Sequence, residues 1–159
     1  MAADRIITCK NDDGFEMSFT ERGFTPFLLV SADGVYERRN NVNITQNVMT
    51  DGGVYQGSVA KYRNITITLK DISDFDENRD LIDKLFKKDS IGLLTMEENG
   101  HTRVIEYVVE KVNSTGTHSV RYTTVGLICP DPFFYDPEDV TVVLSQLISQ
   151  FEFIHEFIE

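Results

Sequence analysis

Apolar and polar residues alternate with a period of two over several short stretches, which is typical of β-strands that bury one face. The clearest stretch covers residues 63–70, where Ile65, Ile67 and Leu69 share one face and polar side chains occupy the other. A slip of one residue would expose this whole apolar set, so we expect the pairing register of the strand to be well fixed. The pattern therefore predicts a half-buried strand at the centre of a sheet.

Other stretches predict strands of the same kind. They are residues 5–10, 15–20, 27–30, 91–96, 102–112 and 120–129, with a further short strand at 140–144. The dipeptides Asp13-Gly14 and Asn99-Gly100 predict hairpin turns, and we expect further turns at 32–34 and 113–117. Apolar residues of the 102–112 strand do not alternate strictly, which indicates a β-bulge near Tyr107 and Val108.

One helix is predicted at residues 75–88. Its apolar residues recur at helical spacing, and lysines gather at its end, where they complement the helix dipole. Asp74 or Asp76 is expected to cap its start. The apolar stripe that we expect to face the core consists of Leu81, Ile82, Leu85 and Phe86. About seven to nine strands joined by close turns, with this one inserted helix, predict a mainly β fold, a sandwich or a barrel.

The stretch from Val35 to Arg63 is different, because its apolar residues have mostly polar neighbours. It predicts a long exposed hairpin with its tip near Gly52, although a mobile loop is the alternative. An arm that buries so little is explained if it pairs with a neighbouring chain by strand addition. The residues that we assign to this inter-subunit arm are Val42, Ile44, Val48, Asp51, Gly52, Gly53 and Tyr55.

A rigid corner follows the last main strand. Three of the four prolines lie between residues 130 and 137, and no helix can run through them. The corner comprises Cys129, Pro130, Asp131, Pro132, Phe133 and Phe134. We expect both phenylalanines to turn back against the body of the domain, with Phe133 in the core or in a buried interface. Nothing in this segment is nucleophilic or basic.

Composition excludes several functional classes. The chain has 159 residues, and its net charge of −11 argues against nonspecific binding to nucleic acid. No run of 18 apolar residues predicts a membrane span, and no signal peptide is visible at the N-terminus. The two cysteines, Cys9 and Cys129, are far apart in sequence and are expected to be buried thiols in a reducing cytoplasm.

No catalytic, cofactor-binding or metal-binding constellation is present. The nucleophile elbow, the zinc-protease motif, the phosphate loop and the dinucleotide fingerprint are all missing. Asp12-Asp13-Gly14 lacks the spacing of a calcium loop, and Glu97 and Glu98 fall at an expected hairpin tip, where a general acid would lack burial. We therefore expect no enzyme and no cofactor.

Several stretches resemble the N-terminal domain of siphophage distal tail proteins. The most specific is the corner Cys-Pro-Asp-Pro-Phe-Phe at 129–134; the others are the opening hairpin, the central strand after a long loop, the helix, and Gly-x-x-Arg-x-Ile at 100–105. Alternating Phe and Glu at 151–159 is an imperfect echo of a Phe-Glu-Phe-Pro repeat in some members. The resemblance implies a tail-tube-like ring domain at 1–145. Residues 146–159 would then be a strand or linker, toward a second domain if the chain is a fragment.

The resemblance also implies a function. Six copies would form a ring at the tip of the virion tail, after assembly in the host cytoplasm. The ring would join the tail-tube protein to the tail-tip hub protein, with receptor-binding proteins as further partners. DNA would only pass through its lumen, where acidic residues would repel phosphates. The alternatives are a tail-tube or tube-terminator protein and, from another class, a carbohydrate-binding β-sandwich, which the absence of tryptophan disfavours.

Overall fold

The computed structural model describes residues 5–22, 26–72, 75–117 and 119–138, and within them the chain forms nine strands and one helix. The predicted strand at 140–144 and the segment 146–159 lie outside the described residues. The elements are β1 (Ile6–Lys10), β2 (Glu16–Thr20), β3 (Phe27–Asp33), β4 (Asn40–Gln46), β5 (Gly53–Ala60), β6 (Arg63–Asp71), α1 (Phe75–Leu85), β7 (Ile91–Glu98), β8 (His101–Gly116) and β9 (Arg121–Cys129).

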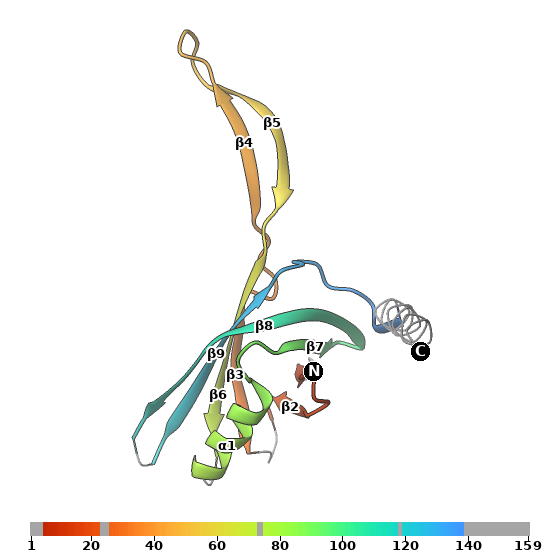
Figure 1. Cartoon of the computed structure of the whole chain (residues 1–159), viewed down its shortest axis with the longest axis vertical. Coiled ribbons are helices and arrows are strands. Elements are labelled where there is room, and N and C mark those ends of the chain that lie inside the picture. Colours follow the sequence, from red (N-terminus) through yellow and green to blue (C-terminus); the bar gives the residue numbers. More distant parts are fainter. Residues whose placement is uncertain (1–4, 23–25, 73–74, 118, 139–159) are drawn as a thin grey trace, which may run out of the picture.

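Seven of these strands close into a barrel in the order β1-β2-β3-β6-β9-β8-β7 (Figure 1). The barrel closes where β7 pairs with β1, from Ile6 opposite Glu97 to Lys10 opposite Leu93. Neighbouring strands are antiparallel, except that β2 and β3 are parallel and meet at Thr20 and Leu28. The mainly β prediction with one inserted helix is confirmed, and the barrel is the form that the sheet takes.

The core fills the inside of this barrel. Ile65, Ile67 and Leu69 of β6 are all fully buried, as their alternation predicted. From α1 and the residue that follows it, Ile82, Leu85 and Phe86 join the same cluster, so the helix covers the barrel with three of the four residues of the predicted stripe. The fourth, Leu81, is only partly buried. None of the described helical residues forms a segment that is both long and apolar enough to cross a membrane.

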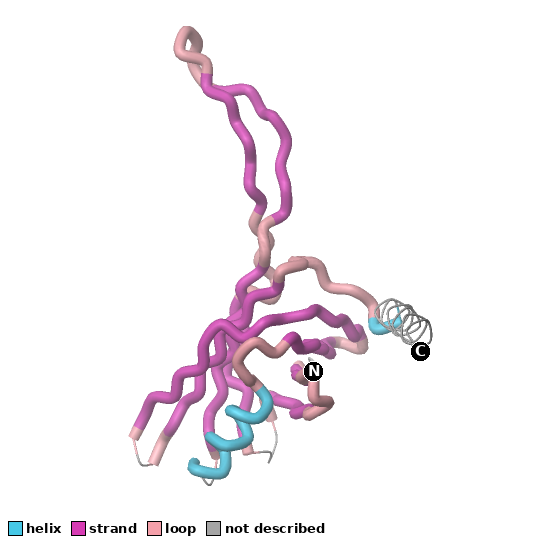
Figure 2. Tube along the Cα trace, in the orientation of Figure 1, coloured by secondary structure: helices cyan, strands magenta, loops and turns pink. Residues whose placement is uncertain are grey.

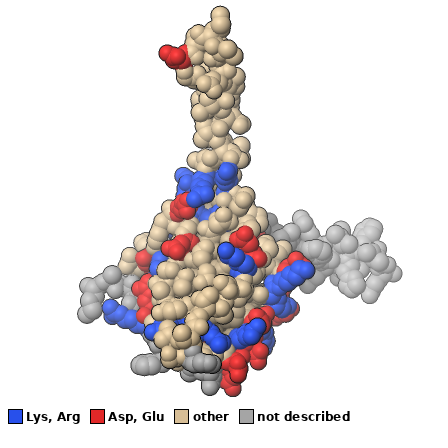
Figure 3. Space-filling view, turned by 90° about the vertical axis from the view of Figure 1, so that its left-hand side faces the viewer, with Lys and Arg blue, Asp and Glu red and all other residues tan. Residues whose placement is uncertain are grey.

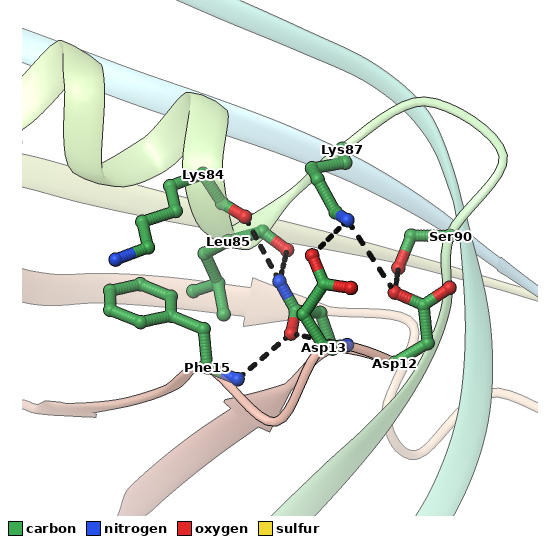
Figure 4. Close-up of polar contacts among 8 residues, drawn as sticks. Asp12, Asp13, Phe15, Lys84, Leu85, Lys87 and Ser90 are labelled. Carbon is green, nitrogen blue, oxygen red and sulfur yellow. Dashed lines mark hydrogen bonds and ion pairs between the residues drawn. The ribbon is translucent and has the colours of Figure 1, made fainter.

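The end of α1 is fixed by the β1–β2 turn (Figure 4). The side chain of Asn11 donates to the carbonyl oxygens of Lys84, at 2.9 Å, and Leu85, at 3.4 Å, which closes the last turn of the helix. Its own Oδ1 accepts from the backbone of Asp13 and Phe15. The helix therefore ends at Leu85 and not at residue 88, because a side chain far away in the sequence takes its terminal carbonyls.

The aspartates of the same turn are also engaged. Lys87 forms ion pairs with Asp12, at 3.7 Å, and with Asp13, and the Ser90 hydroxyl donates to Asp12 at 3.0 Å. These carboxylates thus hold the segment after α1 against the first hairpin. Among the described residues, no group of three potential metal-ligating side chains occurs.

Two strand ends and the position of one bulge differ from the sequence predictions. β3 continues through Asp33 because it pairs with β6 as far as Thr66, so the turn begins only at Gly34. β8 continues to Gly116, where we expected a turn from 113, because Asn113 to Gly116 pair with β9. The bulge predicted near Tyr107 lies between Val109 and Lys111, and β8 is regular at Tyr107, opposite Gly92 of β7.

Candidate functional site

The hairpin β4–β5 projects from the barrel as a separate two-stranded arm (Figures 1 and 2). The strands pair from Asn40 opposite Ala60 to Gln46 opposite Gly53, so the predicted exposed hairpin is confirmed, and its tip comprises residues 47–52. No other described strand pairs with either of them. The arm therefore has two free edges, and its backbone donors and acceptors can accept a further strand.

The predicted arm residues all lie where the sequence placed them. Val42 and Ile44 belong to β4, Val48, Asp51 and Gly52 to the tip, and Gly53 and Tyr55 to β5. All are exposed, and Val48 is 98% exposed. Apolar side chains left in water at this density mark a surface that another molecule covers.

The arm carries almost no charge, which distinguishes it from the rest of the molecule. From residue 40 to residue 60, Asp51 is the only charged side chain. In the space-filling view the arm is uniformly tan apart from one acidic spot near its tip (Figure 3). Exposed edge strands are usually protected from pairing by charged side chains, and this arm lacks that protection.

The root of the arm is held by the guanidinium of Arg63, the first residue of β6. Its Nη1 donates to the carbonyl oxygens of Gly34, Val35 and Glu37, at 3.0, 2.7 and 2.6 Å. Its Nε donates to the carbonyl oxygen of Pro132 at 2.8 Å. One side chain thus fixes the loop that enters the arm and the corner that leaves the barrel.

Burial lowers the pKa of Arg63 below its ordinary value, and the positive charge of Arg38 lowers it further. The group nevertheless stays protonated at neutral pH. The entering loop also needs Gly34, whose φ is +90° and where an added Cβ would overlap the carbonyl oxygen of Asn64. The backbone of Lys61 donates to Arg39 at 2.9 Å and closes the root.

Basic side chains surround this root, and we call them the basic collar: Arg38, Arg39, Lys61 and Arg63. Figure 3 shows basic side chains gathered at the base of the arm. With Glu37, Pro132 and Phe133 they line a small cavity of about 60 Å³. In a chain of net charge −11, the collar is a local basic patch that favours an acidic surface on a partner.

The corner ends the barrel as predicted, but its two phenylalanines differ. Cys129 is fully buried at the end of β9, and Phe134 packs against the core with the Arg63 guanidinium 5.1 Å from its ring centroid. Phe133 is 41% exposed, so it does not belong to the core, and its place in a buried interface stays a prediction. The guanidinium of Arg38 lies 5.8 Å from its ring, at the surface of the collar.

Local hydrogen bonds explain this arrangement of the corner. Asp131 accepts from the backbone of Phe133 at 3.1 Å and from the Tyr135 hydroxyl. The backbone of Tyr135 exchanges two hydrogen bonds with Val104, at 2.8 and 2.9 Å. The segment from Cys129 is thereby pinned to β8, and Pro130, Asp131 and Pro132 form a bridge on the surface between these two anchors.

The buried reactive groups are suited to packing. Cys9 and Cys129 are free thiols inside the barrel, as predicted. Burial raises the pKa of Cys9 and of Tyr107, and raises the pKa of Cys129 to about 12 although Arg63 opposes the shift. All three are therefore neutral at pH 7, and a neutral buried thiol is a poor nucleophile.

Comparison with known proteins gives a likeness of fold. The Dit protein of phage SPP1, described as a paradigm of the hub adsorption apparatus in phages infecting Gram-positive bacteria, superposes with a TM-score of 0.61 and 19% identity. The match covers 82% of this chain and 52% of that one. A chain of the phage P2 baseplate in its activated, Ca-bound conformation superposes with a TM-score of 0.61 and 12% identity, covering 82% and 45%.

This chain thus spans about half the length of the two structures that it resembles. The sequence matches no protein-family model and no curated protein. The expected likeness to phage distal tail and baseplate proteins is therefore found at the level of the fold.

Proposed function

We propose that this chain is a structural protein of a phage tail tip, a distal tail protein whose copies assemble into a hexameric ring. The observation that carries the proposal is the nearly uncharged β4–β5 arm, which projects from a closed barrel with its apolar side chains in water. The likeness to a phage hub protein and a phage baseplate supports the same assignment. We expect no catalytic activity.

In a ring, each copy meets the next through two different surfaces, so one patch must be complementary to another. The arm supplies one patch, because it extends beyond the barrel and can reach a neighbouring copy. The closed barrel supplies a rigid body for the wall of the ring. Arg63 connects the two, so the direction of the arm is set by the barrel and its corner.

The ring would join the tail-tube protein on one face to the tail-tip hub protein on the other, with receptor-binding proteins as outer partners. Its lumen would form part of the channel for DNA. The net charge of −11 suits this role, since an acidic wall repels phosphates and lets DNA pass without binding. The site of action would be the virion tail tip, after assembly in the host cytoplasm.

Negative-stain microscopy of the purified chain over a concentration series, together with its native mass, tests the proposal. We expect six-fold rings with a central hole and an acidic lumen. A chain that stays monomeric at high concentration, even with a tail-tube protein added, would refute it. Rings that stack into tubes without a partner would favour the tail-tube alternative. Heat of binding in an isothermal titration with cell-wall glycans would favour the carbohydrate-binding alternative.

A further inference from the structure

Strand β8 has one half whose outer edge has no partner. It pairs with β7 only from His101 to Val108, whereas its pairing with β9 runs from Val108 to Gly116. Beyond the bulge, the regular run from Lys111 to Gly116 is exposed and is hydrogen-bonded along one edge alone. In the part of the barrel that the structure describes, this is the longest regular run with an unpaired edge.

A groove runs beside this edge and leaves room for an added strand. It is a cavity of about 410 Å³ between α1 and the end of the β8–β9 hairpin. Arg79, Ile82 and Asp83 line it from the helix, and residues 112–116 line it from β8. An extended segment placed here would bond to the β8 backbone and would set one row of its side chains against α1.

The arm contains a strand that fits this edge. The register between β4 and β5 shifts by one residue between Val42 and Ile44, and the extra residue lies on β5, where Gly57 has a φ of +111°. The outer edge of β4 is consequently the more regular one. It has seven residues, Asn40–Gln46, without glycine, proline or charge, against the six residues of the free β8 run.

We propose that β4 of one copy adds to the Lys111–Gly116 edge of β8 in the next copy and extends the β8–β9 sheet across the interface. This rests on the proposed function, since it names the surface that receives the arm. Two unpaired backbone edges would satisfy each other. The polar row of Asn41, Asn43 and Thr45 on β4 would lie beside Asn113 and Thr115, which share one face of β8 with Lys111.

Cross-linking between two single-cysteine variants tests the pairing. Asn43→Cys lies in the middle of β4 and Asn113→Cys near the middle of the free β8 run, and both positions are exposed. Glu16→Cys is the matched control, because Glu16 is exposed on β2, which also has an unpaired edge. The native thiols are both fully buried, so the unsubstituted chain measures the background with a short thiol-reactive linker.

With one variant of each mixture isotope-labelled, mass spectrometry counts the mixed dimers. We expect roughly tenfold more mixed dimers from Asn43→Cys with Asn113→Cys than from Asn43→Cys with Glu16→Cys, because assembly raises the local concentration of the first pair of thiols. Equal yields in samples that sediment as rings would overturn the pairing and leave the proposed function intact. Equal yields in samples that sediment as monomers would overturn both.

Charge variants at the same two positions give an independent measure. The double variant Asn43→Lys/Asn113→Lys should assemble less than its two single variants predict, because like charges meet across the added strand. Asn43→Lys/Asn113→Glu should restore assembly. Equal assembly of the two double variants, with unchanged melting temperatures, would contradict the pairing.

Discussion

The Nε atom of Arg63 lies 2.8 Å from the carbonyl oxygen of Pro132, and this contact joins the root of the arm to the corner at the end of the barrel. The same guanidinium holds three carbonyl oxygens of the loop that enters the arm. The planar fork of an arginine can serve several fixed acceptors at once, which the ammonium group of a lysine cannot do in this geometry. Arg63 is thus a positioning residue for the arm.

Arg63→Lys should loosen this root. The variant keeps the charge but leaves partly buried carbonyl oxygens without donors, so we expect the free energy of unfolding to fall by about 1–3 kcal/mol. Hydrogen exchange of residues 34–37 should also accelerate. Arg39→Lys, in the same collar but exposed, is the control and should change little. Unchanged exchange in Arg63→Lys would show that the backbone alone sets the root.

Replacing each of the two phenylalanines of the corner should lower the free energy of unfolding by different amounts. Phe134→Ala removes a ring that packs against the core, and because the ring is partly buried we expect a loss of about 1–3 kcal/mol, below that of a fully buried ring. Phe133→Ala should cost about 0.5 kcal/mol or less, as at an ordinary surface site. Urea unfolding of both variants measures this, and a larger loss for Phe133→Ala would contradict the structure.

Gly92 provides the space for the buried ring of Tyr107 on the neighbouring strand. A Cβ at this position would overlap that ring, so Gly92→Ala should destabilise the barrel by about 1–3 kcal/mol. Gly126→Ala is the matched control in a strand, because its Cβ would meet mainly the flexible side chain of Lys111 at 3.0 Å. Equal melting temperatures for the two variants would show that the ring of Tyr107 can move aside.

Asp71 should make stability depend on pH. Burial raises its pKa above the ordinary 3.8, although Thr123, which donates to it at 3.1 Å, opposes the shift. Its contribution to stability is full below pH 3.8 and is lost as pH rises through the higher pKa of the folded state.

Asp71→Asn keeps an acceptor for Thr123 and removes the ionisation. It should therefore unfold at a higher denaturant concentration than the natural chain at pH 7, and the difference should shrink toward pH 3.8. Asp33→Asn, at an exposed site of β3, controls for the loss of one negative charge. A difference that grows toward low pH would contradict the assigned direction.

The period of two predicted the fold well where one face is buried. Ile65, Ile67 and Leu69 show it, because the side of the strand alone decides which residues are buried. The weak pattern of residues 35–63 predicted the arm for the opposite reason. A strand that packs against no core has no buried face, so its sequence shows no strict alternation of apolar and polar residues.

Features that depend on distant partners could not be predicted. Arg63 resembles any cation at the start of a strand, and only the fold brings Pro132 to it. The free edge of β8 exists because β7 begins only at Ile91, opposite Val108, and the end of α1 depends on Asn11. Phe133 and Phe134 are equivalent in sequence, and the turn set by Asp131 decides which one reaches the core.

The most direct test of the account is the native mass of the chain with and without its arm, measured over the same concentration range. Replacing residues 41–59 by a short glycine-serine linker leaves every barrel strand and the Arg63 contacts in place. We predict a ring for the intact chain and, for the shortened one, a monomer with the same melting temperature. A shortened chain that still forms the ring would contradict the role of the arm.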